Sequence, residues 1–355
     1  MNSASGWGGG ERMFLELALG FGEAGHSVTV VTRPSAVLAA RLPANVNACL
    51  LPCRGDLDVL SLLKLFRLFR ERRFAAVFCN QGRDCMLAGL AALPSGIPVV
   101  RVKAMEDTRR NPRNLLMYRY LLSAVVCVSQ AVQLGLADLR LRSLHSVIIP
   151  NGIEIPPPSV DRAAARARFG IAIDQFVVAF SGRFVHEKGV DLLPAIAAKV
   201  VAQGLPLRLL VAGDGPLRPA VEAEVERRGL SEVVSFLGFL DDPLPVLVAA
   251  DAALMPSRTE AFPVAALESL ALGVPLVACR AGGVVEIVTD GETALLAAPE
   301  DVDGLAVALL QLHREPQLAE RLRSRGRARA SELSRPRMIQ SYEALVRQVA
   351  TRAAI

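Results

Sequence analysis

The first half of the chain alternates short apolar runs with longer segments in which apolar residues recur every three or four positions. The short runs predict buried strands and the longer segments predict helices. Strands that alternate with helices imply a parallel sheet covered on both faces, with ligands at the carboxyl ends of the strands. The predicted strands are Ser27–Thr32, Ala75–Cys79, Pro98–Val102, Ala124–Val128 and Ser146–Ile149, and the predicted helices are Glu11–Glu23, Leu57–Phe74, Asp84–Leu93 and Asn114–Leu122.

A cluster of turn-forming residues separates this series from a second one. Pro150-Asn151-Gly152 is followed by Pro156-Pro157-Pro158-Ser159, and we place the domain boundary there. We expect an α/β protein with two doubly wound, Rossmann-like lobes facing one another across a cleft, an N-terminal lobe over 1–155 and a C-terminal lobe over 156–335. The second series predicts strands over Phe176–Ser181, Leu207–Ala212, Val233–Leu237, Ala252–Met255 and Pro275–Cys279, with helices at about Val190–Gln203, through Glu224 and from Pro263.

The helix predicted over Leu57–Phe74 is apolar on most faces and gathers its cations at its C-terminal end. Cations there complement the helix dipole, and an apolar helix packs beside a sheet, which is the interpretation we favour for the helix itself. Alternatively, its basic end belongs to a face of the lobe that lies on anionic lipid. The other arginines of that face would be Arg109, Arg110, Arg113 and Arg119.

Composition narrows the class of protein. Hydrophobic residues make up 52% of 355, enough for two cores, yet no run approaches the roughly 18 apolar residues of a membrane span. The first residues, MNSASGWGGGER, lack the pattern of a secretory signal. Six cysteines without CxxC spacing and only four histidines favour reduced thiols in a cytoplasm and argue against structural zinc.

Charge is distributed unevenly along the chain. Residues 1–150 carry 18 Lys and Arg against 10 Asp and Glu, whereas residues 151–355 carry 22 against 25. The basic first half suggests an anionic partner there, such as a phospholipid surface or a phosphorylated acceptor. Nucleic acid is not expected as a partner, because one Trp and three Tyr provide no basic tract interleaved with aromatic residues.

The segment Ser257–Gly283 holds the main candidate for chemistry. Pro263 marks a helix start, so Glu260 lies in the loop before the helix and Glu268 near its second turn. Both carboxylates can then face one cleft beside the unpaired N–H groups of the first turn. Such a site suits a ligand with phosphate at one end and hydroxyls at the other. Two ordinary surface glutamates at a helix start are the alternative.

A basic pair follows another predicted strand. Arg183 and Lys188 come between the strand that ends at Ser181 and the next helix. A guanidinium fork and an ammonium group at this place could neutralise a diphosphate without a metal ion. Structural ion pairing with Glu187 or Asp191 is the alternative.

Three segments with glycine could approach a ligand closely, because glycine has no Cβ. The first segment, near the N-terminus, suits an anion or a sugar. The second suits a tight turn, and the third suits the edge of a nucleobase. A flexible lead-in, a simple turn and an ordinary strand end would explain the same segments without a ligand. The segments are Gly9-Gly10, Gly213-Asp214-Gly215 and Leu237-Gly238-Phe239.

The order of these motifs resembles that of the retaining GT-B glycosyltransferases of family 4, over nearly the whole chain. Each motif is weak alone, whereas the ordered set is specific. The residues that carry the resemblance are Gly9-Gly10-Glu11-Arg12, Ile149-Pro150-Asn151-Gly152-Ile153-Glu154, Gly182-Arg183, Lys188-Gly189, Gly213-Asp214-Gly215-Pro216, Phe236 with Gly238, Glu260-Ala261-Phe262-Pro263 through Glu268, and Gly282-Gly283 with Glu286.

The resemblance implies transfer of a sugar from a nucleotide-diphosphate donor to an acceptor, with the anomeric configuration kept and no metal cofactor. It assigns the donor phosphates to Arg183 and Lys188 and the ribose hydroxyls to Glu268. No separate general base is assumed, since the leaving phosphate oxygen can take the acceptor's proton. Further implied contacts are Gly9 and Gly10 with the phosphates, Gly213, Gly215, Leu237, Gly238 and Phe239 with the nucleotide, and Glu260, Ala261, Phe262 and Pro263 with the donor sugar.

The sequence departs from the family's pattern at two places. A histidine often follows the strand that corresponds to Pro98–Val102, and none is present here. Lys103 or Arg101 could substitute electrostatically, and Glu106 or Asp107 could face the acceptor. Ala261 stands where glycine is commoner, which should leave the backbone path open.

The implied acceptor is a glycolipid or saccharide, as in the biosynthesis of lipopolysaccharide, glycolipid or cell-surface polysaccharide. The enzyme would be cytoplasmic, with its N-terminal lobe in peripheral contact with an anionic membrane. In this family a C-terminal helix, here about 336–355, packs back on the first lobe. A sugar-nucleotide epimerase of similar fold and an inactive scaffold that binds a sugar nucleotide are the alternatives.

Overall fold

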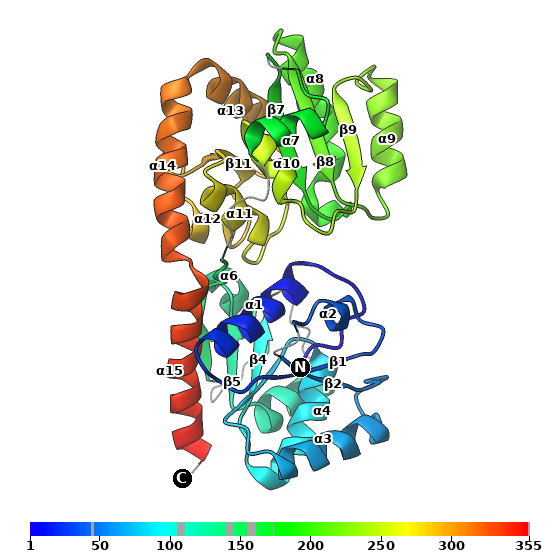
Figure 1. Cartoon of the computed structure of the whole chain (residues 1–355), viewed down its shortest axis with the longest axis vertical. Coiled ribbons are helices and arrows are strands. Elements are labelled where there is room, and N and C mark those ends of the chain that lie inside the picture. Colours follow the sequence, from blue (N-terminus) through cyan, green and yellow to red (C-terminus); the bar gives the residue numbers. More distant parts are fainter. Residues whose placement is uncertain (44–45, 105–110, 140–144, 155–160, 173, 354–355) are drawn as a thin grey trace. The chain divides into compact units, whose positions relative to one another are not determined.

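The chain folds into two units, each built on parallel β-strands (Figure 1). The computed structural model describes residues 1–43, 46–104, 111–139, 145–154, 161–172 and 174–353. Unit 1 comprises Met1–Glu154 and Leu333–Ile355, and unit 2 comprises Ile155–Glu332. The predicted α/β class is confirmed. The unit boundaries therefore lie after residues 154 and 332. From the sequence we expected them after residues 155 and 335.

The strands of unit 1 form two parallel sheets, β1-β2 and β3-β4-β5-β6. Residues 1–3 lie between them, since Asn2 N donates to Val31 O at 3.0 Å and Asn80 N donates to Met1 O at 3.2 Å. Every residue of β5 is buried, which explains its uninterrupted apolar sequence. The strands are β1 Thr29–Thr32, β2 Asn47–Leu50, β3 Val77–Cys79, β4 Val99–Lys103, β5 Ala124–Cys127 and β6 Ser146–Ile148.

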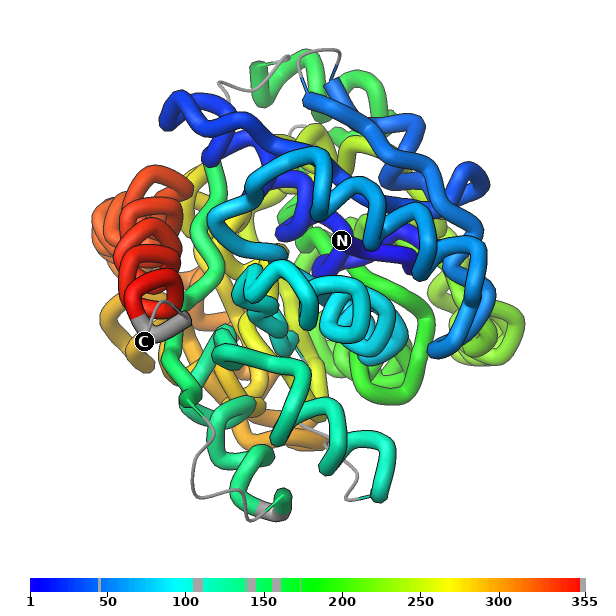
Figure 2. The backbone as a smooth tube through the Cα atoms, turned by 90° about the horizontal axis from the view of Figure 1, so that it is seen from below, coloured from blue at the N-terminus to red at the C-terminus, as the bar shows by residue number. Residues whose placement is uncertain are grey.

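Helices flank these sheets, and two pairs of them lie side by side. Helix α3 runs alongside α4 (Figure 2). Helix α1 packs closely on α15, because a Cβ at Gly20 would lie only 2.4 Å from Ile339 Cγ1. The helices are α1 Gly9–Glu23, α2 Val37–Ala40, α3 Val59–Glu71, α4 Gly82–Ala92, α5 Pro112–Leu116, α6 Gln130–Leu134 and α15 Arg335–Ala353, with single turns at η1 Leu93–Ser95, η2 Met117–Leu121 and η3 Ala137–Leu139.

Helix α3 is buried on one face only. Ser61, Leu65 and Phe69 face inward, whereas Leu60 is 54% exposed and Leu63 is 62% exposed. The interpretation of this segment as a helix simply buried beside a sheet is therefore wrong for its outer face. The helix has more apolar residues than one buried face can hold, so some of them are exposed.

Arg335 joins α15 to the rest of unit 1. Its Nη1 lies 2.9 Å from an oxygen of Glu16, and its Nη2 lies 2.8 Å from an oxygen of Glu23 and also pairs with Glu154. Arg335 and Glu16 are both buried. Burial raises the pKa of Glu16, although the hydrogen bond from Arg335 opposes this effect. The segment after residue 333 is thus tied by charge and by packing to the start of the chain.

Unit 2 contains one six-stranded parallel sheet in the order β12-β11-β10-β7-β8-β9. The order reverses beside β7, as expected of a doubly wound sheet. The strands are β7 Phe176–Ser181, β8 Leu207–Ala212, β9 Val234–Gly238, β10 Ala252–Met255, β11 Leu276–Cys279 and β12 Leu295–Ala297. The helices are α7 Arg162–Arg168, α8 Leu193–Ala202, α9 Arg218–Arg227, α10 Leu244–Ala249, α11 Val264–Leu272, α12 Val284–Ile287, α13 Val302–Arg314 and α14 Pro316–Glu332, with single turns at η4 His186–Lys188 and η5 Val190–Leu192.

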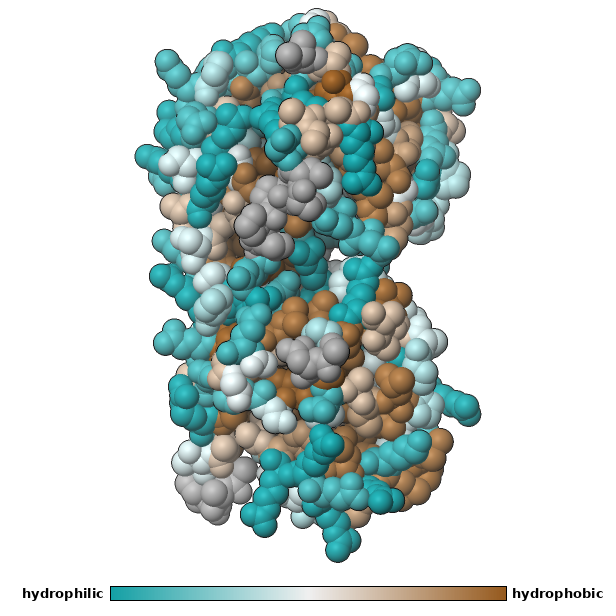
Figure 3. Space-filling model, viewed as in Figure 1, coloured by the Kyte–Doolittle hydropathy of each residue, from teal (hydrophilic) through white to brown (hydrophobic). Residues whose placement is uncertain are grey.

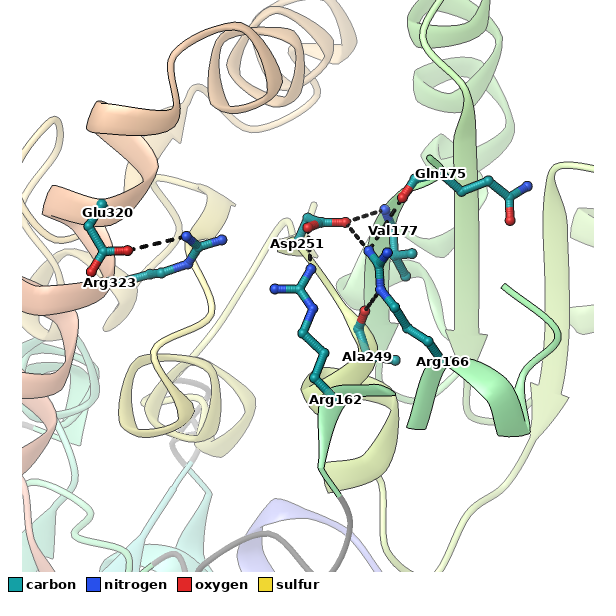
Figure 4. A network of polar contacts seen from close by, with 8 residues as sticks. All are labelled: Arg162, Arg166, Gln175, Val177, Ala249, Asp251, Glu320 and Arg323. Carbon is teal, nitrogen blue, oxygen red and sulfur yellow. Dashed lines mark hydrogen bonds and ion pairs between the residues drawn. The ribbon is translucent and has the colours of Figure 1, made fainter. Parts of the chain in front are cut away.

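Asp251 anchors α7 to the amino ends of two strands (Figure 4). It accepts hydrogen bonds from Arg166 Nη2 at 2.6 Å and from Val177 N at 2.8 Å, and it pairs with Arg162. Val177 is the second residue of β7, and Asp251 directly precedes β10. This ionic network therefore belongs to the edge of the sheet opposite the strands' carboxyl ends, and it has a structural role.

None of the helices in the described ranges combines the length and the apolar character that crossing a bilayer requires.

Candidate functional site

Glu260 is a buried carboxylate in the loop between β10 and α11, at the carboxyl edge of the unit 2 sheet. It is 6% exposed. Lys188 Nζ lies 2.6 and 2.8 Å from its two oxygens, and Ser257 Oγ donates to it at 2.7 Å. Lys188 does not pair with Glu187 or Asp191, as the structural alternative supposed. It joins another predicted site residue instead, which compensates the buried charge.

The turn that carries Lys188 can reach Glu260 because of a glycine. Gly189 has a φ of +63°, and a Cβ there would lie 2.0 Å from Pro256 O. Any side chain would therefore push the turn after β7 away from the loop after β10. The close approach of the two loops is a property of the backbone, and it sets the distance between Lys188 and Glu260.

Arg258 clamps the same two loops together from the other side. Its guanidinium makes two parallel bonds of 2.7 Å to Asp191, and Nη1 also donates to His186 O at 2.8 Å. Its backbone N donates to Glu187 O at 2.8 Å. Bidentate arginine–carboxylate contacts are among the more rigid polar contacts in proteins. Arg258 thus holds the turn of Lys188 against the loop of Glu260.

Glu300 completes this clamp from a strained backbone. Its carboxylate pairs with Arg258 Nε, and its φ is +68°, in the left-handed region that residues other than glycine rarely occupy. The hydrogen bonds from Arg258 hold the pKa of Asp191 and that of Glu300 below their ordinary values. Strain of this kind persists only where surrounding contacts impose it, and it clusters at functional sites.

Helix α11 begins close to the predicted position. Pro263 is its N-cap residue, one position before the helix, and Glu268 is in the second turn and 3% exposed. Phe262 is 4% exposed and Pro263 is also buried, so of the three predicted sugar contacts after Glu260 only Ala261 is half-buried. The backbone of Glu260 is fixed as well, because its carbonyl accepts from Gly283 N at 2.8 Å.

The glycine turn after β8 packs against the segment that carries Arg183. A Cβ at Gly213 would lie 1.8 Å from Gly182 O, and one at Gly215 would lie 2.8 Å from Phe184 O. These glycines are therefore required by packing within unit 2, whatever they bind. Arg183 itself is exposed, and within the described residues no carboxylate lies at ion-pair distance from it. Its positive charge is available to a ligand.

The predicted nucleobase segment contains a β-bulge. Val211 pairs with Phe236 and Ala212 pairs with Gly238, so Leu237 is an extra residue in β9. Gly238 has a φ of +71°, and Phe239 next to it is 55% exposed. The segment is therefore more than an ordinary strand end. Bulges re-aim side chains and are frequent beside active sites.

The predicted residues of unit 1 that the structure describes lie in β4 or in the first turn of α1. Gly9 and Gly10 form the first turn of α1, so the predicted glycine loop is in fact the start of the helix, whose N–H groups are still unpaired within it. Lys103 ends β4 and is 3% exposed. Arg101 Nη1 donates to Tyr118 Oη at 2.5 Å, which gives Arg101 a structural role. Glu106 and Asp107 lie outside the described residues.

Sequence reasoning missed three members of the site, which are Ser257, Arg258 and Glu300. The first two lie three and two positions before Glu260 in SRTE, so a hydroxyl and a cation near a site carboxylate were available as a signal. The sequence around Glu300 gave no such signal, because Glu300 contacts Arg258, which is 42 positions away in the chain. Within the described ranges no three His, Cys, Asp or Glu residues are grouped to hold a metal ion.

Comparisons with known proteins agree with this geometry. The model of the family described as Glycosyl transferases group 1 matches residues 161–329, and that of Glycosyltransferase Family 4 matches residues 7–155. The chain is 33% identical over 297 residues to a GDP-mannose-dependent alpha-(1-6)-phosphatidylinositol dimannoside mannosyltransferase of Mycobacterium tuberculosis, which covers 81% of this chain and 73% of the relative.

Other matches are shorter or are structural. A 2-deoxystreptamine glucosyltransferase of Streptomyces kanamyceticus is 34% identical over 189 residues, which is 52% of this chain and 48% of the relative. The chain thus spans about half the length of this and similar curated relatives. The crystal structure of Anabaena HepE in complex with UDP has the same fold, with a TM-score of 0.82, 21% identity and 98% coverage of both chains. Two family models that together span most of the sequence, and a relative matched over most of its length, place this chain in glycosyltransferase family 4, with the GT-B fold.

Proposed function

We propose that this chain transfers a sugar from a nucleotide-diphosphate donor to an acceptor, with retention of the anomeric configuration and without a metal ion. The observation that carries the proposal is the Lys188–Glu260 pair, held between two fixed loops at the carboxyl edge of the unit 2 sheet. Open α/β sheets bind their ligands at this edge. Membership of the family supports the type of reaction.

The donor diphosphate is the group that unit 2 is suited to hold. The side chain of Lys188 is 26% exposed although it is paired, so its ammonium group can reach a ligand while Glu260 fixes its place. Arg183 adds a second cation whose charge is not neutralised among the described residues. Departure of a diphosphate develops negative charge, and fixed cations and helix N–H groups stabilise it. The departing oxygen can then accept the acceptor's proton on the same face.

The two buried carboxylates would bind hydroxyls of the donor. Glu268 would accept from the ribose and Glu260 from the sugar, because ionised carboxylates form stronger hydrogen bonds than neutral acceptors do. Ala261 and the exposed ring of Phe239 would contact the sugar and the base, respectively. Gly9 and Gly10, in the first turn of α1, remain predicted contacts of the phosphates.

Donor binding is tested first, by a thermal-shift screen over uridine, guanosine and adenosine diphosphate sugars. The Mycobacterium relative is named for GDP-mannose and the Anabaena structure contains UDP, so both nucleotides belong in the screen. A bound donor stabilises the fold in proportion to ln(1 + [L]/Kd). We expect the shift to vanish in Lys188→Ala and in Glu268→Gln. Arg280→Gln, which removes an exposed cation paired with Asp290, should leave it unchanged.

Turnover separates transfer from its alternatives. A transferase releases nucleoside diphosphate only when an acceptor is supplied. A sugar-nucleotide epimerase converts the donor without an acceptor, and an inactive scaffold binds it unchanged. Absence of nucleotide binding in the whole screen would refute all three.

We also propose that the acceptor is a glycolipid or saccharide, used in the synthesis of lipopolysaccharide, glycolipid or cell-surface polysaccharide at the cytoplasmic face of a membrane. Of the large apolar side chains exposed in the described ranges, all but three lie in unit 1. Helix α3 alone exposes four of them, Val59, Leu60, Leu63 and Phe66. Lysine and arginine follow on its later turns, and its surface combines apolar and polar groups (Figure 3, lower right). Helices with apolar and basic outer surfaces bind anionic membranes.

Liposome flotation tests this contact. Leu60→Ser combined with Leu63→Ser should lower binding to anionic vesicles by about tenfold or more, since each leucine loses roughly 1.5–3 kcal/mol of burial. Val307→Ser in unit 2 is the matched control, because Val307 is 61% exposed and Leu63 is 62% exposed. Equal binding by both variants, or binding that is indifferent to lipid charge, would contradict the proposal.

A further inference from the structure

Two arginines of unit 1 share one backbone acceptor. Arg33 Nη2 donates to Cys53 O at 2.6 Å, and Arg83 Nη1 donates to the same oxygen at 2.8 Å. The two guanidinium groups are therefore close neighbours, at a separation where like charges repel. Each guanidinium carries five N–H donors, and this carbonyl takes one from each.

The charge of this pair is not neutralised by the protein. Within the described ranges neither Arg33 nor Arg83 has a carboxylate at ion-pair distance, and Arg33 Nε is buried with no hydrogen-bond partner. A third guanidinium, that of Arg113, lies over Gly82 but is matched by Asp56. The nearby Asp84 is buried and accepts from Ser3 N and Gln81 N. The cluster therefore keeps a net positive charge.

The shared carbonyl is held by a strained residue. Cys53 has a φ of +43° and is fully buried, and its N donates to Ser61 Oγ at 3.0 Å. Its thiol is not a candidate nucleophile, because burial raises its pKa to about 11. The left-handed backbone instead presents the carbonyl to both arginines, and such strain is frequent at binding sites.

The cluster lies where ligands bind in parallel sheets. Arg33 directly follows β1, Cys53 follows β2 by three residues, and Arg83 is in the first turn of α4, which follows β3. β1 is parallel to β2 and β3 is parallel to β4, and each of the three residues follows the carboxyl end of its strand. The two hydrogen bonds to Cys53 O bring these strand ends together. The first turn of α4 adds backbone N–H groups and the positive end of a helix dipole.

We propose that Arg33 and Arg83 bind a phosphate group of the acceptor, which would make the acceptor a phosphorylated saccharide or a phospholipid-linked one. This inference rests on the proposed transfer reaction, because it names the substrate of the same reaction. One N–H of each fork fixes the guanidinium on Cys53 O, and the remaining donors face the anion. Arginine forks match the geometry of phosphate oxygens, and desolvated pairs of them bind dianions well.

Arginine footprinting on the full wild-type chain tests the proposal without any substitution. Phenylglyoxal modification is followed peptide by peptide with and without inorganic phosphate. We expect phosphate to slow modification of Arg33 and Arg83 about fivefold or more and to leave Arg227, a surface arginine of α9 paired with Glu224, unchanged. Equal rates at Arg33 and Arg83 with and without phosphate would overturn the proposal.

The same experiment separates this site from the donor site. A nucleoside diphosphate should protect Arg183 in unit 2, whereas phosphate and glycerol 3-phosphate should protect Arg33 and Arg83. Loss of protection at Arg183 alone would refute the donor assignment and leave the acceptor site standing. Loss of protection at Arg33 and Arg83 alone would refute the acceptor site and leave the donor assignment standing.

Variants then identify the source of the phosphate. Arg33→Gln combined with Arg83→Gln should weaken phosphate binding about tenfold, while Arg227→Gln should not. Protection of the wild type by glycerol 3-phosphate but not by phosphatidylcholine vesicles containing phosphatidate indicates a soluble acceptor. Protection by the vesicles indicates a lipid-linked one. If the double variant does not fold, the footprint of the wild type still decides.

Discussion

At the residue scale, Lys188 and Glu260 depend on each other for stability as well as for chemistry. Removing Lys188 leaves a carboxylate that is 6% exposed, and among the described residues only the hydroxyl of Ser257 still donates a side-chain hydrogen bond to it. Breaking a buried pair from one side costs more than replacing both partners. We predict that Lys188→Met lowers the free energy of unfolding by about 2 kcal/mol, and that Lys188→Met with Glu260→Leu recovers part of it.

Urea denaturation of the two single variants and the double variant measures this coupling. The double variant should remain inactive although it is more stable than Lys188→Met. If the two single effects simply add, the pair is not coupled and Glu260 has another source of compensation.

Gly189 allows a second test at this scale, because a matched glycine exists. Gly189 and Gly229 have almost the same φ, +63° and +68°, but a Cβ at Gly189 meets Pro256 O at 2.0 Å whereas Gly229 faces open space. We predict that Gly229→Ala costs about 1 kcal/mol, from the left-handed backbone alone. Gly189→Ala should cost about 3 kcal/mol or more and abolish donor binding, since the loops must separate. Thermal unfolding measures the loss of stability, and nucleotide titration measures donor binding. Equal losses of stability in the two variants would show that the two loops can separate at Gly189 at little energetic cost.

At the scale of elements, the Arg258 clamp should control both donor affinity and acid stability. Carboxylates whose pKa is depressed in the folded state, here Asp191 and Glu300, stabilise the fold above their ordinary pKa of about 4. This contribution disappears as the pH falls through the folded-state pKa. We predict that the melting temperature of wild type and Arg258→Ala differs at pH 7 and converges below about pH 4.

Kinetics of the same variant test its positioning role. Arg258 contacts the two loops rather than the proposed donor groups, so Arg258→Ala should raise the donor KM about tenfold with a smaller loss of kcat. Arg258→Lys should not restore the KM, because a single ammonium cannot make the bidentate contact to Asp191. Rescue by lysine would show that charge alone suffices.

Several elements were predictable because their signals are local. Buried parallel strands such as β5 are continuous apolar runs, and the start of α11 was placed to within one residue by Pro263. The outer face of α3 was not predictable, since periodicity does not say which apolar positions find a partner. The bulge at Leu237 and the strain at Glu300 depend on register and on contacts between distant residues, which no local pattern encodes.

At the scale of the whole molecule, unit 1 is assembled from both ends of the sequence. We predict that Arg335→Met destabilises unit 1 by about 3 kcal/mol and leaves unit 2 unaffected, because Glu16 loses its buried partner. Amide hydrogen exchange reports the two units separately. Since burial raises the pKa of Glu16, part of the loss should return as the pH is lowered and Glu16 takes up a proton. Faster exchange in unit 2 would contradict the prediction.

The charge of the units follows from the same assembly. Unit 1 carries 22 Lys and Arg against 12 Asp and Glu, and unit 2 carries 18 against 23. The comparison of residues 1–150 with 151–355 had already indicated a basic N-terminal part, and residues from 333 onward add to its positive charge. Sequence composition thus predicted which unit carries the excess of positive charge. It could not identify Arg33 and Arg83 as a pair, because a carbonyl 20 positions after Arg33 and 30 before Arg83 brings them together.

The return of α15 to unit 1 also imposes an order on biosynthesis. A ribosome that has produced residues 1–154 has not yet made Met338, Tyr342, Leu345 or Val349, which complete the core of that unit. Unit 2 is a continuous stretch and is fully available once residue 332 has emerged. The nascent chain can therefore finish its second unit before its first, and the exposed apolar groups of the unfinished first unit are the ones a chaperone would meet.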